Sequence, residues 1–198
     1  GMMEYLAMAG ANRTGALSFG FDPKKGPEVW QPEDPLLPLP GEEASIEQLI
    51  EAANALLDGE ATRDHFRWLL ATGSDNIGGA RPKARITDDE GEWIAKFSMM
   101  DDPFDDPKME AVSLSLARAC GIDVPEHKLM KAGPRSVLLV RRFDRRNGNR
   151  EWLRYLSAAT MLGEDPNQYR SAYSYADLSA RAREVGVAPC EKELFTRL

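Results

Sequence analysis

The chain contains few of the residues that build metal sites and disulfide frameworks. Its 198 residues include two cysteines, Cys120 and Cys190, and two histidines. Because the cysteines are far apart and form no CxxC pair, the sequence argues against both a zinc site and a disulfide framework. Cys120 falls within a predicted helix, where we expect a buried small apolar residue.

Long apolar runs and an excess of positive charge are also absent. No stretch approaches the ~18 consecutive apolar residues of a membrane span, and the first residues lack the basic and apolar regions of a signal peptide. The 32 acidic and 25 basic residues give a net charge of −7. This balance argues against a general binder of nucleic acid or anionic membranes, and a cytoplasmic protein is the simplest interpretation.

Charge is concentrated in two segments of the chain. Residues 88–106 carry eight acids and one lysine, whereas residues 141–154 carry six arginines and two acids. Runs of charge commonly form solvated surface, and we expect this of both segments.

The apolar pattern of the first third of the chain changes from strand to helix. Residues 15–21 alternate like a strand, and five prolines make 26–41 irregular. Helical spacing follows at 42–59, with Ser45 as a candidate N-cap, and at 63–73.

Two β-hairpins are predicted next, on either side of a third helix. The first, at 81–99, turns at 88–91, and the second lies at 127–143. We expect the helix between them to have Asp106 as its N-cap and Pro107 as its first residue. Its predicted apolar stripe consists of Met109, Val112, Leu116 and Ala119. Further helices are predicted at 152–163 and 174–185, so the fold class is α+β with a small antiparallel sheet.

A glycine-rich stretch, GSDNIGGARPKA at 73–84, precedes the first hairpin. Adjacent glycines alone usually mark a tight turn. The stretch is not a Walker A loop, because Lys83 follows a proline and precedes a strand. It is not a Rossmann fingerprint, because no strand precedes it and no helix follows. A glycine loop that leads into a hairpin is the context of a kinase phosphate loop, whose backbone N–H groups approach phosphate oxygens.

Two downstream residues suit the same chemistry. A kinase uses a strand lysine to hold the α- and β-phosphates and a helix glutamate to fix that lysine. Lys96 lies in the strand WIAKF, and Glu110 lies in the first turn of the next helix. Each also has a simpler interpretation: Lys96 can point to solvent from an edge strand, and Glu110 can complement the helix dipole.

In their order along the chain, several segments resemble the HipA family of bacterial serine/threonine kinases, the toxins of type II toxin–antitoxin systems. The segments are GSDNIGGARPKARI, WIAKF, EAVSLSLARACGIDVPEHKL, VLLVRRFDRR, NRTGALSF and SAATML. The resemblance implies a kinase-like N-lobe with an N-terminal extension and the beginning of a helical C-lobe. It divides the chain into an N-terminal subdomain at 1–70, an N-lobe with glycine loop and hinge at 71–145, and the first C-lobe helices at 146–198.

The resemblance also implies an ATP site. The glycine loop would cover the phosphates, Lys96 would contact them, Glu110 would orient Lys96, and 141–143 would form a hinge around adenine. The residues expected to bind or position ATP are Asn76, Gly78, Gly79, Ala80, Lys83, Lys96, Glu110, Arg141, Arg142 and Phe143.

By the same resemblance, the complete kinase transfers the ATP γ-phosphate to a serine of a protein, in the best-known case glutamyl-tRNA synthetase, an aminoacyl-tRNA synthetase. A helix-turn-helix antitoxin on operator DNA is an expected partner, and the basic run after the hinge suggests partner or direct DNA contact.

Two departures from the family pattern stand out. Asn76 occupies the position at which some members autophosphorylate a serine, although Ser74 is nearby. The family's catalytic aspartate and its Mg²⁺-binding asparagine and aspartate come after a segment that corresponds to ELFTRL, the last six residues here. We therefore assign no catalytic or metal-binding residue, expect Mg²⁺ only in the complete kinase, and expect the 198 residues alone to be inactive.

Two other interpretations remain open. The chain can be a non-catalytic kinase remnant that binds an antitoxin or another partner protein. It can also be a plain α+β domain whose glycine loop is only a turn, in which case Lys96 and Glu110 are not paired.

Overall fold

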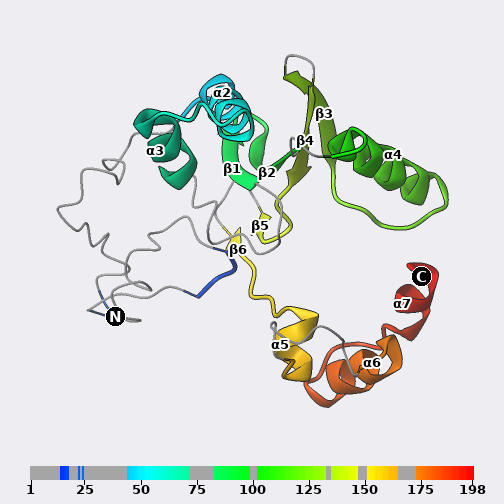
Figure 1. Ribbon diagram of the computed structural model, residues 1–198. Helices are drawn as coiled ribbons and strands as arrows, with labels where there is room; N and C mark the ends of the chain where they lie inside the picture. The colour runs from blue at the N-terminus through cyan, green and yellow to red at the C-terminus, as the bar shows by residue number, and fades with distance from the viewer. Residues whose placement is uncertain are drawn as a thin grey trace. The chain divides into compact units, whose positions relative to one another are not determined.

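The computed structural model describes residues 14–17, 22, 24, 44–71, 83–98, 102–132, 135–146, 151–164 and 173–198 (Figure 1). The chain forms two compact units, one of Gly1–Arg118 with Asp123–Arg154 and the other of Ala119–Ile122 with Tyr155–Leu198. Within the described ranges, no helix is long and apolar enough to cross a membrane.

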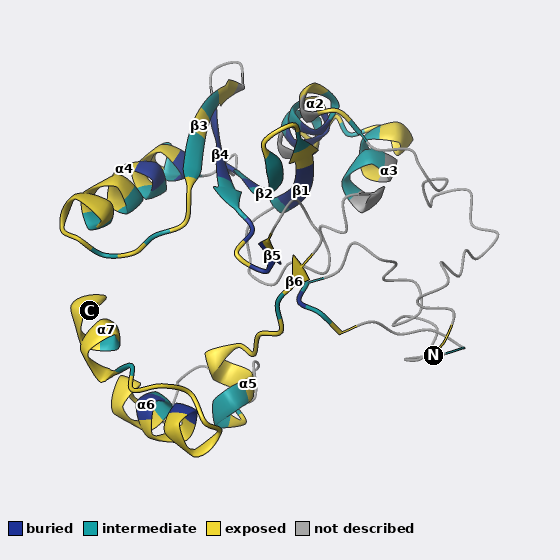
Figure 2. Ribbon diagram, turned by 180° about the vertical axis from the view of Figure 1, so that it is seen from behind, coloured by how far each residue is buried: buried dark blue, intermediate teal, exposed yellow. Residues whose placement is uncertain are grey.

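A four-stranded antiparallel sheet is the centre of the first unit. Its order is β1-β2-β4-β3, formed by β1 (Lys83–Asp88), β2 (Gly91–Phe97), β3 (His127–Ala132) and β4 (Arg135–Arg141). Figure 2 shows the dark blue of buried residues along β1, β2 and β4, whereas β3 is teal and yellow. Both predicted hairpins are confirmed, and so is the α+β class with its small antiparallel sheet.

The turn between β1 and β2 is fixed by one carboxylate and one glycine. Asp88 Oδ1 accepts hydrogen bonds from the backbone N–H groups of Glu90 and Gly91 and from the Trp93 indole. Gly91 has a φ of 142°, and a Cβ there would overlap the guanidinium of Arg141. The turn therefore requires glycine at this position.

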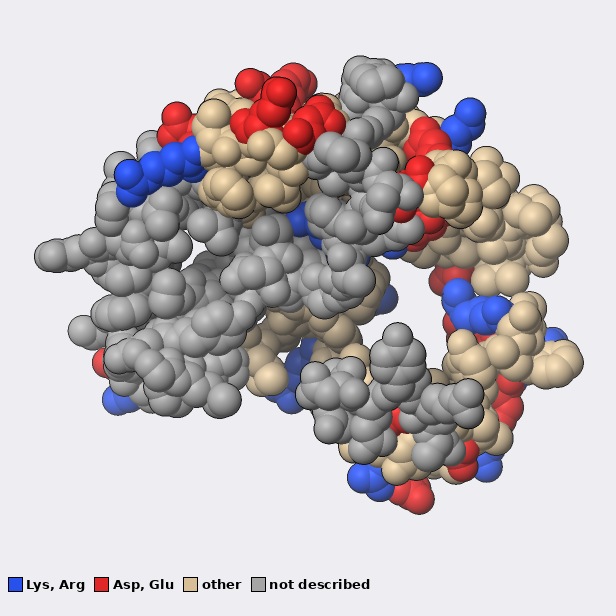
Figure 3. All heavy atoms as spheres, viewed as in Figure 1, with Lys and Arg blue, Asp and Glu red and all other residues tan. Residues whose placement is uncertain are grey.

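Helix α2 (Ile46–Leu57) covers one face of the sheet. Ser45 caps it through a capping box with Gln48, as its position predicts. The helix contains no basic residue, and acidic side chains gather over it on the face shown in Figure 3. Helix α3 (Arg63–Ala71) adds partly buried Trp68 and Leu69 to the same core.

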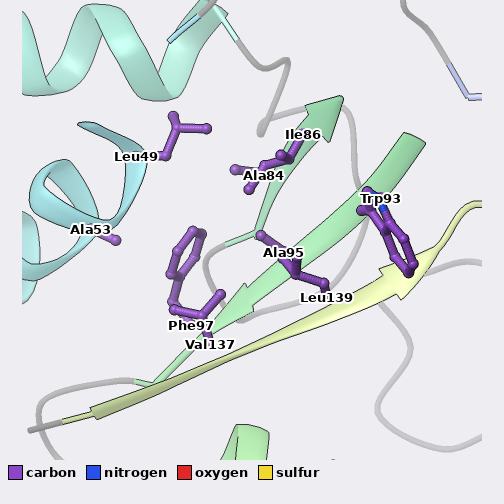
Figure 4. Packing of buried hydrophobic residues seen from close by; sticks show 9 residues of the cluster. All are labelled: Leu49, Ala53, Ala84, Ile86, Trp93, Ala95, Phe97, Val137 and Leu139. Atoms are coloured by element: carbon purple, nitrogen blue, oxygen red, sulfur yellow. The ribbon is translucent and has the colours of Figure 1, made fainter. Parts of the chain in front are cut away.

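The core lies between α2 and the strands (Figure 4). Alternation along β2 directs Trp93, Ala95 and Phe97 to this face, where all three are buried. The buried cluster consists of Leu49, Ala53, Ala84, Ile86, Trp93, Ala95, Phe97, Val137 and Leu139.

Helix α4 (Asp106–Ala119) joins β2 to β3. Its N-cap is Asp105 rather than the predicted Asp106: Asp105 Oδ1 accepts the Lys108 N–H at 3.3 Å, while Asp105 Oδ2 accepts a hydrogen bond from Ser136 Oγ. The sequence predicted the N-cap one residue too late, because Asp105 and Asp106 are both suitable capping residues.

The predicted apolar stripe of α4 is not buried. Met109, Val112 and Leu116 are each more than half exposed, whereas Pro107 and Ala111 are the buried residues of the helix. Cys120, expected to be buried in this helix, is exposed and lies just beyond its end. The helix stops at Ala119, and Gly121 follows with a left-handed φ of 81°.

The last part of the first unit is a short ribbon of β5 (Arg145–Arg146) and β6 (Glu151–Trp152). The helix predicted at 152–163 is therefore too long. Trp152 pairs with Arg145 across the ribbon, and the helix begins only after Ser157, whose side chain accepts the N–H of Thr160.

The second unit contains α5 (Ala158–Leu162), α6 (Tyr175–Glu184) and α7 (Glu191–Thr196). Helix α6 confirms the prediction at 174–185, with Ser174 and Asp177 forming a capping box.

Several predicted features fall outside the described residues, namely the proline-rich segment 26–41 and the glycine loop with Asn76, Gly78, Gly79 and Ala80. Of the strand predicted at 15–21, residues 15–17 are described; residues 15 and 16 belong to a bend, and residue 17 has no regular structure. Gly15 has a φ of 77°, which is incompatible with a regular strand.

Candidate functional site

Lys96 of β2 and Glu110 of α4 form an ion pair and a hydrogen bond between Nζ and Oε1. Alternation places Lys96 on the face of β2 opposite Trp93 and Ala95, so α4 meets the sheet on the side away from α2. The two side chains are 30% and 34% exposed, respectively. The pairing contradicts the plain α+β interpretation, which expected these residues to be apart.

Lys83 lies directly beside this pair. The register of β1 and β2 makes Lys83 the cross-strand partner of Lys96, and the same row continues to Leu138 of β4 and Leu129 of β3. Like charges directly opposite each other on a sheet are unfavourable. Lys83 and Lys96 thus bring two ammonium groups to neighbouring strands on one face of the sheet, and phosphate oxygens are strong acceptors for such donors.

The row of Lys83 and Lys96 lies at the end of β1 that leads out of the glycine loop. The nearest described residue to the loop on this side is Lys83 itself. In the sequence, the glycine loop thus ends a few residues before the end of β1 at which the two lysines are opposed.

Arg141, the first predicted hinge residue, lies farther along the sheet. It pairs with Trp93 of β2, three residues from Lys96, which is a separation of about 10 Å. Its side chain donates to Glu126 and to the carbonyl of Glu90 and lies over the Trp93 ring. The Arg141 side chain thus secures the β1–β2 turn.

Arg142 and Asp144 belong to a buried charge cluster. Arg142 donates from Nε to Asp144 Oδ1 at 3.0 Å and from Nη2 to Asp144 Oδ2 at 2.9 Å. Its Nη1 donates to Glu92 at 2.9 Å. Arg145 adds bonds to Asp144 and an ion pair to Glu92. The expectation that 141–154 is all solvated is therefore wrong for these residues.

The environment lowers the pKa of Asp144. Burial raises this pKa, but hydrogen bonds from Arg142 and the Gly15 N–H, together with the charges of Arg142 and Arg145, outweigh burial. The Asp144 carboxylate is consequently ionised at neutral pH and matches the buried positive charges.

Phe143, the last predicted hinge residue, differs from its neighbours because its side chain is largely exposed. The hinge segment therefore places one aromatic ring outward between two buried charged residues. The geometry separates the predicted site residues into those that line the α4 face of the sheet, Lys83 and Lys96 with Glu110, and those that hold the sheet end, Arg141 and Arg142.

Asp144, Glu92 and Gly15 were not among the site residues predicted from the sequence. The aspartate inside RRFDRR offered one signal, because an acid between two pairs of arginines has opposite charges on both sides. Its partner Gly15 is 129 residues away, and such a pairing leaves no local pattern.

Residues 76–198, more than half of the chain, match the family model described as HipA-like C-terminal domain. The chain therefore belongs to the HipA-like family. Neither the curated proteins nor the solved structures include a significant match.

Proposed function

We propose that the chain is the ATP-binding portion of a HipA-like serine/threonine protein kinase, which when complete transfers the ATP γ-phosphate to a protein serine. The observation that carries the proposal is the ion pair of Lys96 with Glu110, beside Lys83 on the neighbouring strand. The membership of the family adds support.

The residues present fit a polyphosphate. Lys96 is partly exposed, and an ammonium group has three donors, of which Glu110 accepts one. Phosphate oxygens are strong acceptors for the others, and Lys83 supplies a second positive charge. ATP would bring the transferable phosphoryl group, while Lys96 and Lys83 would hold its phosphates and Glu110 would keep Lys96 in place.

The base and the phosphates of a nucleotide must be held apart. The lysine row and the hinge at 141–143 lie at two levels of β2 about 10 Å apart. This spacing supports adenine at the hinge and phosphates at the lysines.

Calorimetric titration with ATP tests the proposal in wild type, Lys96→Ala and Lys128→Ala. Lys128 is the matched control, because it is a sheet lysine with the same 30% exposure and is also ion-paired with acids. We expect the loss of one charge-assisted hydrogen bond to weaken ATP binding by about tenfold or more in Lys96→Ala. Lys128→Ala is expected to bind as wild type does, and equal affinity in all three proteins contradicts the proposal.

A second candidate function is a non-catalytic module that binds a partner protein such as an antitoxin. The exposed apolar side chains of α4, Met109, Val112 and Leu116, favour it. This function predicts no saturable ATP binding by wild type in the same titration. Substrate choice among proteins such as aminoacyl-tRNA synthetases, and any contact with DNA, belong to the complete kinase.

A further inference from the structure

The segment 14–17, which we call the N-terminal strap, is bound to the residues that follow the hinge. The Gly15 N–H donates to Asp144 Oδ2 at 2.7 Å, and Arg145 Nη1 donates to the Gly15 carbonyl at 3.2 Å. Arg85 of β1 donates to Thr14 Oγ1 at 2.8 Å. Contacts from Asp144, from Arg145 of β5 and from Arg85 of β1 thus hold a segment that is more than 120 residues away from Asp144 in the chain.

Asp144 is the common member of these contacts. Its Oδ2 accepts from Gly15, Arg142 and Arg145, while Oδ1 accepts from Arg142. Its side chain is 4% exposed. The cluster contains two arginines, Arg142 and Arg145, and two carboxylates, those of Asp144 and Glu92.

The same cluster fixes the backbone on both sides of Phe143. The Arg142 N–H donates to the Glu92 carbonyl of β2, and the Asp144 carbonyl accepts from the Leu153 N–H. The hinge residues therefore keep their position relative to β2, and thus to Lys96, as long as Asp144 holds its partners.

We propose that Asp144 is a positioning residue which locks the N-terminal strap to the hinge and thereby sets the affinity of the site for nucleotide. This proposal rests on the proposed ATP binding and adds a regulatory element to it. With the strap attached, the hinge has one position and the site is ready to bind. When the strap is released, the hinge samples other positions, and the apparent affinity falls with the fraction that remains competent.

The test compares the full chain with Asp144→Asn, Thr14→Ala and Asp88→Asn. Asparagine replaces one carboxylate oxygen with an NH₂ group and carries no charge, so it cannot hold Arg142 through two oxygens while it accepts from Gly15, as the carboxylate does. Thr14→Ala removes the Arg85 contact without altering a buried charge. Asp88→Asn is the control, because Asp88 also accepts two backbone N–H groups but only within its own hairpin.

Two readouts are measured, namely exchange of the Gly15 amide hydrogen by NMR and the ATP dissociation constant by calorimetry. We expect Asp144→Asn to speed Gly15 exchange and to raise the ATP dissociation constant, each by about tenfold. Thr14→Ala should change both in the same direction by about two- to threefold. Asp88→Asn should leave both as in wild type.

Faster Gly15 exchange with unchanged ATP affinity overturns the proposal and leaves the proposed function standing. The proposal is also overturned if Gly15 exchange is unchanged in both Asp144→Asn and Thr14→Ala. It is overturned as well if the control Asp88→Asn loses as much ATP affinity as Asp144→Asn does. If wild type binds no ATP, the proposed function fails and the link to nucleotide fails with it. Thr14→Ala keeps the test decisive if Asp144→Asn does not fold.

Discussion

Two groups of charged residues in the first unit differ in burial. In the open group of Lys83, Lys96 and Glu110, the two side chains of the ion pair are each about one-third exposed. In the buried group of Glu92, Arg142, Asp144 and Arg145, the arginines and carboxylates contact one another and are largely inaccessible to solvent. A ligand can reach a partly exposed group but not a buried one. We therefore expect the open group to contact a ligand and the buried group to position the hinge.

Mutation of the buried group should lower the free energy of unfolding more than mutation of the open group does. Asp144→Asn leaves two buried guanidinium groups with one carboxylate, and breaking such a pair costs about 3–5 kcal/mol. Urea unfolding at neutral pH measures this free energy. A loss under about 1 kcal/mol would show that the cluster is not held as tightly as its contacts indicate.

Low pH should remove the contribution of the Asp144 carboxylate to the free energy of unfolding. The folded pKa of Asp144 lies below its ordinary value of 3.8. Its stabilisation is therefore fully present above the unfolded pKa and is lost as pH falls through the folded pKa. We expect the difference in unfolding free energy between wild type and Asp144→Asn to be constant from pH 7 to about 5 and to narrow below about 4. Unfolding curves recorded across this range check it, and a constant difference down to pH 2 contradicts the assignment.

Mutation of the open group should change the affinity for ATP more than the free energy of unfolding. Lys96→Ala is expected to change the unfolding free energy by no more than about 1 kcal/mol, because a partly exposed ion pair contributes little. Its effect on ATP affinity should be about tenfold or more. If unfolding and binding change together to a large extent, the two groups do not differ in the way proposed.

Exchanging the two charges gives the finest test of the open group. The double variant Lys96→Glu with Glu110→Lys retains an ion pair between β2 and α4 but moves the ammonium group onto the helix. We expect its stability to return within about 0.5 kcal/mol of wild type, while ATP affinity stays low. If the double variant regained ATP affinity, the site would need an ammonium group but would not need it on β2.

The sequence predicted much of the open group and little of the buried one. A turn at 88–91 implies the register that opposes Lys83 and Lys96, and the pairing with Glu110 follows the order of strand and helix. The cluster joins Asp144 and its near neighbour Arg142 to Glu92, which is 50 residues from Arg142, and to Gly15, which is 129 residues from Asp144. In the sequence, the part of this cluster at 141–146 looks like an ordinary run of exposed charged residues.

The same limit applies to α4. Helical spacing predicted the helix, and its N-terminal aspartates predicted its start to within one residue. The spacing did not show that Met109, Val112 and Leu116 stay exposed, because periodicity identifies an apolar face but not what covers it.

The most direct test of the central claim compares ATP with adenosine as ligands of wild type and of Lys96→Ala. If the α4 face of the sheet holds phosphates, wild type should bind ATP more tightly than adenosine by about tenfold or more, and Lys96→Ala should lose most of that preference. Adenosine affinity itself should be the same in both proteins. Equal affinity of wild type for ATP and adenosine, or a preference that survives in Lys96→Ala, would contradict the account.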